Sequence, residues 1–142
     1  MEQIKVYLQL WEDLRQHGLK TIELIEKEQK WDFSVMPEEH SIRGTFQHTL
    51  KAIFEETSRF TADKTLYDPL DDPRDDLNRV MTRIIKTIES FHDQDLGTEY
   101  IFPWGKKTTL AGAIHQILFH TAGHFAQLRN WIGISKRSQT RK

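Results

Sequence analysis

Three histidines, at positions 115, 120 and 124, lie within ten residues of one another in the segment "HQILFHTAGHFAQLRNWIG". Neutral imidazole binds divalent transition metals and also transfers protons near neutral pH. His120 and His124 are four residues apart, so on a helix their rings are neighbours and can occupy adjacent corners of one coordination shell. The chain contains no cysteine, so every metal ligand must come from His, Asp or Glu.

A helical wheel separates these three histidines. With Leu110 at zero, His124 and His120 fall about 40° and about 80° to one side, on one edge of the apolar stripe, whereas His115 falls near 140° on the far face. We therefore predict that His115 is exposed to solvent.

An HxxxH pair alone is weak evidence for a metal site, because a histidine at a core edge more often bonds to a carbonyl or to water. A third ligand from a facing helix would strengthen it.

His48 is the best candidate for that third ligand, because it lies inside a predicted helix. His17, His40 and His92 are expected at the surface. The wheel of residues 41–62 does not favour His48, however, since it lies about 160° from the mean of the strongly apolar stripe.

The same helix has a second, milder stripe that His48 borders. Its members are Ile42, Thr45, Thr49, Ala52 and Glu56. The strongly apolar face could lie in the core or form a dimer contact, while the milder face lines a cleft. Periodicity does not choose between these arrangements.

Four segments that would position these side chains show helical periodicity or capping signals. Ser41 is a good N-cap for the second helix, Asp72 followed by Pro73 starts the third, and Thr108 or Thr109 can cap the fourth. The predicted helices comprise residues 3–29, 41–62, 73–92 and 108–132.

The connections between these helices contain proline, glycine and mixed polarity, and none of them indicates a convincing strand. Gly133 follows the last helix in the usual stop position, which predicts a frayed basic tail over 134–142. The sequence thus predicts one all-α domain over residues 1–142, a four-helix bundle with long crossover connections.

Composition excludes several classes of function. Twenty Lys and Arg balance 21 Asp and Glu among 142 residues, for a formal charge of -1, so nucleic acid and anionic membranes are not expected partners. No apolar run is long enough for a membrane span, and the first residues are charged where a signal peptide would be apolar. We expect a cytoplasmic protein.

Three motifs occur in order along the chain. In "SIRGTFQH", Ser41 precedes His48 by seven residues; "PWGKKTT" comes just before the last helix; and "HTAGHFAQL" carries His120 and His124 followed by Gln and Leu. In these motifs and in its helix layout the chain resembles the DinB/YfiT-like family of four-helix-bundle metalloenzymes over nearly its whole length. The resemblance implies that the metal ligands are His48, His120 and His124.

Such a site has a definite chemistry. Three neutral imidazoles leave a divalent ion with an open position, as in catalytic zinc sites, and zinc or nickel suits these ligands best. The resemblance implies a metal-dependent transferase that uses a low-molecular-weight thiol such as bacillithiol or mycothiol, or a hydrolase, acting on a small molecule. The family often has His-Arg-Gly-Gln at the second ligand of the pair; here His124 is followed by Phe125, so any substrate role of that Arg is absent.

Three further residues are weak catalytic candidates. Gln116 and Gln127 share the helix edge of the histidine pair and could orient a ligand or water, although each is equally well explained as an exposed amide. Glu55, seven residues after His48, could accept a hydrogen bond from a ligand or act as a general base. A solvated charge is the favoured interpretation of Glu55.

A second hypothesis is a non-catalytic helical binding or stress module, dimeric, whose metal only stabilises it. The absent Arg at position 125 favours this alternative, and we expect a homodimer under either hypothesis. A role in DNA repair, suggested only by the historical family name, has no support in charge or motif.

Overall fold

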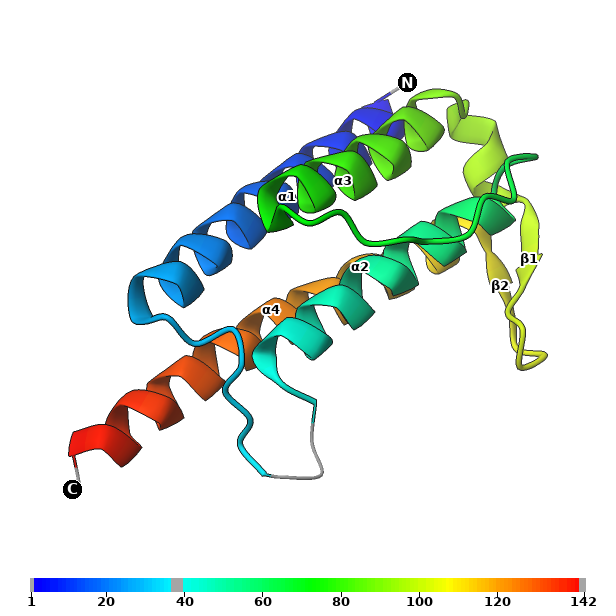
Figure 1. Cartoon of the computed structure of the whole chain (residues 1–142). Coiled ribbons are helices and arrows are strands. Elements are labelled where there is room, and N and C mark those ends of the chain that lie inside the picture. The colour runs from blue at the N-terminus through cyan, green and yellow to red at the C-terminus, as the bar shows by residue number, and fades with distance from the viewer. Residues whose placement is uncertain (1, 37–39, 141–142) are drawn as a thin grey trace.

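The computed structural model describes residues 2–36 and 40–140. Its four long helices are α1 (Glu2–Glu28), α2 (Ile42–Arg59), α3 (Pro73–Glu89) and α4 (Leu110–Thr140). Helix α1 packs on α3 and α4, and α2 packs on the same two helices (Figure 1). This bundle confirms the predicted all-α class. Helices α1 to α3 end one to three residues before their predicted ends.

The apolar stripes of all four helices meet in one core. The strongly apolar face of α2 lies in this core, which answers the question that periodicity left open. Its buried members are Ile42, Phe46, Leu50 and Ile53. Trp11 of α1, Met81 of α3 and Phe125 of α4 are among the large side chains that are almost fully buried with them.

At the predicted starts of α2, α3 and α4, a side-chain oxygen accepts a hydrogen bond from a backbone N–H of the first turn. The Ser41 hydroxyl accepts from the Gly44 N–H at 3.0 Å, and the Asp72 carboxylate accepts from the Arg74 N–H at 2.8 Å, just before Pro73. Helix α4 begins at Leu110, and the Thr109 hydroxyl accepts from the Gly112 N–H at 3.1 Å. These caps satisfy N–H groups that have no partner inside the helix.

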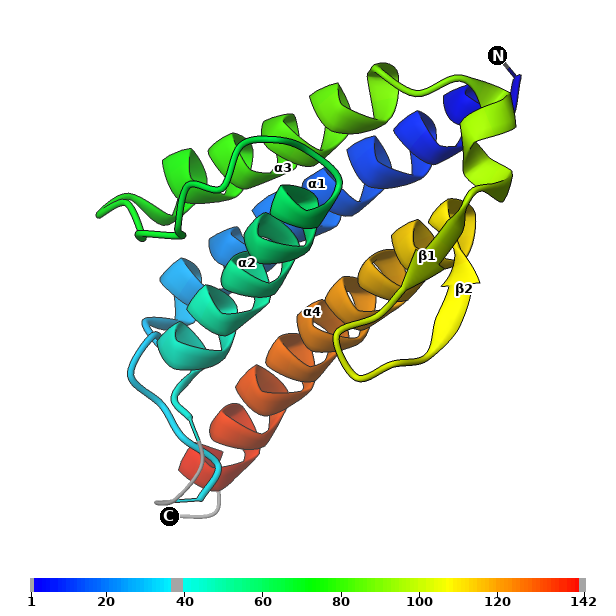
Figure 2. The same cartoon turned by 90° about the vertical axis from the view of Figure 1, so that its right-hand side faces the viewer.

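A short hairpin follows the 3₁₀ turn η1 (Asp93–Gly97) and was not predicted. Strand β1 (Glu99–Ile101) pairs antiparallel with β2 (Lys107–Thr109), and Tyr100 lies opposite Thr108. Gly105 has φ of 90°, which the turn requires and which favours glycine. Figure 2 shows the hairpin beside the first turns of α4. Three-residue strands are too short to show a clear alternation of apolar and polar residues.

The predicted end of the last helix at Gly133 is wrong, because α4 continues to Thr140. Ser135 is buried and the ammonium group of Lys136 lies 3.3 Å from the Glu28 carboxylate of α1. These contacts show that the turns after Gly133 pack on the rest of the bundle, although one glycine inside a helix costs about 1 kcal/mol. Residues 134–140 are therefore helical instead of frayed, and 141–142 lie outside the described residues.

None of the helices within the described residues combines the length and the apolar character that crossing a membrane would require.

Candidate metal centre

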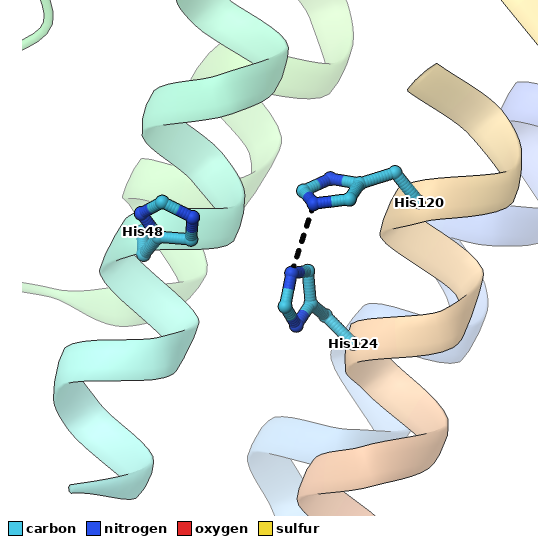
Figure 3. Close-up of side chains that lie close together, drawn as sticks. All are labelled: His48, His120 and His124. Atoms are coloured by element: carbon cyan, nitrogen blue, oxygen red, sulfur yellow. Dashed lines mark hydrogen bonds between the residues drawn. The ribbon is translucent and has the colours of Figure 1, made fainter. Parts of the chain in front are cut away.

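The structure brings His48, His120 and His124 together. His48 is on α2 and faces the other two, which lie one turn apart on α4 (Figure 3). One ring nitrogen of each residue can be chosen so that all three lie within 4.8 Å of one another. A tetrahedral zinc ion with bonds of about 2.0–2.1 Å separates its ligand atoms by roughly 3.3 Å. The three side chains thus fit one metal ion after small rotations of their rings.

His48 reaches this position because α2 is covered on two sides. The helix packs on both α3 and α4, and its milder stripe includes the buried residues Thr45 and Thr49. The Thr49 hydroxyl donates to the Thr45 carbonyl at 2.7 Å, which satisfies its polar group without a partner on another helix. His48 borders this stripe and is itself exposed, so its ring can turn toward α4 without displacing core side chains.

The hydrogen bonds of His124 define its protonation. Its Nδ1 lies 3.0 Å from Gln127 Oε1, an acceptor, so Nδ1–H donates to Gln127. In a neutral ring Nε2 then carries a lone pair, and it accepts from His120 Nε2–H at 3.0 Å. Both Nε2 atoms are directed at one point between the rings. A metal ion would replace the shared proton there, and Gln127 would hold the ring in the orientation that the ion needs.

The pKa of His120 is shifted although the residue is exposed overall. Desolvation, followed by the neighbouring His124 and His48, lowers the pKa of His120 below its ordinary value of 6.5. The ring is therefore neutral at neutral pH, and binding a metal through Nε2 would require its other tautomer, in which Nδ1 carries the proton. The three-residue group contains no carboxylate, so a divalent ion would keep its full charge.

The other four histidines are exposed, as the sequence predicts, and one of them makes a contact that was not predicted. His115 is exposed and packs edge-on against Tyr7, with ring centroids 5.1 Å apart. His17 and His92 are exposed as well. His40 is also exposed, but its ring is stacked on that of His48 at 6.5 Å, a contact that the sequence did not predict.

A cavity of about 170 Å³ opens beside His120. Three of its lining residues come from α4 and two from the hairpin: the full set is Ala52, Glu56, Phe102, Trp104, Gln116, Ile117 and His120. Gln116, a predicted candidate, is therefore next to the histidine cluster. Glu55 is not in this lining, and its carboxylate lies 3.9 Å from the Lys51 ammonium.

The hairpin supplies a part of this site that the sequence did not predict. Tyr100, Phe102 and Trp104 alternate along "YIFPW", and successive rings are 5.4 Å and 4.5 Å apart. This alternation of aromatic residues was the available signal. The alternation involves only three aromatic residues and includes a proline, which is equally typical of an irregular connection.

The fold and the site together define a class, that of four-helix bundles in which facing helices bring histidine side chains together. Within that class, the chain belongs to the DinB superfamily, whose family model matches residues 4–128. The crystal structure of a DinB-like protein, YjoA, from Bacillus subtilis is similar to this chain with a TM-score of 0.70 and 16% sequence identity. The similarity covers 90% of this chain and 92% of YjoA. No curated protein matches the chain.

Proposed function

We propose that this protein binds one divalent transition metal, zinc or nickel, through His48, His120 and His124. The observation that carries the proposal is the convergence of three imidazoles from two helices, with nitrogen atoms within 4.8 Å of one another. Family membership supports it, because the resemblance in the three motifs implies the same three ligands. When bound, the ion supplies a Lewis acid that lowers the pKa of a coordinated water or thiol.

The activity we propose is that of a metal-dependent thiol S-transferase of the bacillithiol or mycothiol type, or of a hydrolase, acting on a small molecule. The chain has no cysteine, so a thiol nucleophile has to come from a cosubstrate. Gln127 orients His124, and the cavity beside His120 is a place for the substrate. Gln116 lines that cavity and offers an amide that can donate to or accept from the substrate.

Elemental analysis of the purified protein tests the metal site. We expect about one ion per chain in the wild type, and loss of that ion in His48→Ala and His120→Ala. His115→Ala is the matched control, since His115 is exposed on the same helix as His120 but lies outside the cluster. Undiminished metal in both ligand variants would exclude this site.

A test of the activity follows once metal is bound. Metal-loaded protein is incubated with several low-molecular-weight thiols and electrophiles, and thiol consumption and thiol binding are both measured. Absence of both would contradict the S-transferase proposal. The same assays without thiol, on hydrolysable substrates, test the hydrolase alternative.

The second candidate is a non-catalytic dimeric module in which the metal only stabilises the fold. Phe125 favours it, because this side chain is 1% exposed and packs in the core at the position where the family often has Arg. Chelation would then lower the melting temperature strongly in a protein without thiol reactivity. Sedimentation equilibrium tests the homodimer that we propose for both candidates.

A further inference from the structure

The cavity beside His120 has two aromatic side chains stacked in its wall. The rings of Phe102 and Trp104 are 4.5 Å apart and inclined by only 6°. Phe102 is buried, which fixes the base of the stack, whereas Trp104 is 64% exposed. Ala52 of α2 and Ile117 of α4 complete the apolar lining. A tryptophan left so exposed at the edge of an apolar hollow gives a flat surface on which another ring can stack.

The size of the cavity fits one ring. Its volume is about 170 Å³, and an apolar cavity of about 150 Å³ engineered in another protein binds benzene. His120 lines the same cavity. A molecule whose ring occupies the cavity can therefore reach the histidine cluster through a short arm.

The charges around the cavity favour a neutral occupant. The lining includes one carboxylate, that of Glu56, which forms an ion pair with the Arg59 guanidinium one turn further along α2. The Tyr100 hydroxyl donates to the same carboxylate at 3.3 Å. Because Glu56 is already paired and hydrogen-bonded, it does not require a cation from the ligand. Gln116 adds an amide but no charge.

We propose that this cavity binds a neutral aromatic ring of the substrate, joined by a short arm to the sulfur or oxygen atom that reaches the metal. The inference rests on the proposed function, since the metal site anchors the other end of the molecule. It adds a substrate class, small metal-binding molecules that carry a single uncharged ring, and it applies to the substrate and not to a bacillithiol- or mycothiol-type cosubstrate, which has no aromatic ring. The specificity would come from Trp104 and Phe102 of the hairpin, not from the three histidines.

Ligand binding to the cobalt-loaded protein tests this inference without an activity assay. Phenylmethanethiol and 2-mercaptoethanol share a thiol and differ in the ring, and the sulfur-to-cobalt charge-transfer band reports the binding of each. We expect phenylmethanethiol to bind about tenfold more tightly. Trp104→Ala removes the stacking surface and Ala52→Leu fills the cavity, and each should reduce this preference to about threefold or less.

Phe119→Ala is the matched control for nonspecific contact with the ring. Phe119 is 82% exposed and does not line this cavity, but it lines a shallow hollow on the other side of His120 with His124 and Gln127, so the control also tests whether the ring lies there. The control should keep the tenfold preference. Equal binding of the two thiols by the wild type would overturn the inference and leave the metal site intact, and so would a preference that persists in both cavity variants.

A readout on the metal-free protein separates the two proposals. The chain has four tryptophans, so its indole N–H groups give four NMR signals, and Trp104→Phe identifies one of them. Benzyl alcohol should shift the Trp104 signal and leave that of the fully buried Trp11 unchanged. Lack of a Trp104 shift would overturn the inference even if metal binds. If the protein binds no metal but benzyl alcohol still shifts the Trp104 signal, the proposed function is overturned. The ring would then still bind in the cavity, but not as part of a substrate anchored by a metal.

Discussion

The hydrogen bond between Gln127 and His124 gives a quantitative prediction about metal affinity. Gln127→Leu keeps the size of the side chain but removes the acceptor that lies 3.0 Å from His124 Nδ1. Loss of such a partner typically weakens metal binding by about 10- to 100-fold. Gln127 is exposed, so water can replace part of the lost hydrogen bond, and we expect the lower end of this range, about tenfold or about 1.4 kcal/mol.

The assay is competition for zinc between the protein and a chromophoric chelator, which gives the affinity of wild type and variant directly. Gln127→Glu retains an acceptor at the same position and should keep or increase the affinity. Thermal unfolding of the metal-free proteins is the control for a merely structural effect, and Gln127→Leu should unfold within a degree or two of the wild type, because the residue is exposed. A zinc affinity of Gln127→Leu equal to that of the wild type would refute the role assigned to this hydrogen bond.

The remaining predictions concern packing, pH and metal removal. Gly18→Ala should destabilise the fold by about 1–3 kcal/mol in chemical denaturation, because its Cβ would lie 2.8 Å from Leu77 Cδ2. Gly123→Ala, whose new Cβ would project into open space, should stabilise it by about 0.4–1 kcal/mol instead. The lowered pKa of His120 means that the folded metal-free protein binds fewer protons than the unfolded chain, so the free energy of unfolding should fall as the pH is lowered from 6.5 toward that pKa; an NMR titration of this ring showing a raised pKa would contradict the cause we assign. Excess zinc should raise the melting temperature and a chelator should reverse the change, by an amount set by the ratio of free zinc to its dissociation constant.

The parts of the fold that local chemistry determines could be predicted from the sequence. Four amphipathic segments predicted the four helices. Ser41 and Asp72 form the N-caps that Ser and Asp side chains favour. The end of α4 could not be predicted in this way. Gly133 is a stop signal only if nothing holds the next turn, and here Ser135 is buried and Lys136 pairs with α1. Those contacts are tertiary, so they have no signature in the local sequence.

The candidate site shows the same division between local and tertiary information. His120 and His124 share a helix, so their common edge follows from the 100° rotation per residue. His48 lies on another helix, and its position depends on α2 being packed against α3 and α4 at once. A single-helix wheel assumes one buried face and therefore misplaces such a residue. The resemblance in motif order indicated His48 because it carries information about the whole fold.

The replacement of Arg by Phe125 and the aromatic cavity have a common consequence. An Arg after the second ligand would suit an anionic substrate, since a guanidinium binds carboxylates and phosphates well. In this chain Phe125 is 1% exposed and contributes to the core, and the one carboxylate in the cavity lining, Glu56, is paired with Arg59. The wall beside His120 is mainly apolar, with the stacked rings of Phe102 and Trp104. Under the function that we propose, both features favour an uncharged substrate, so we expect the specificity of this chain to differ from that of relatives that have the Arg.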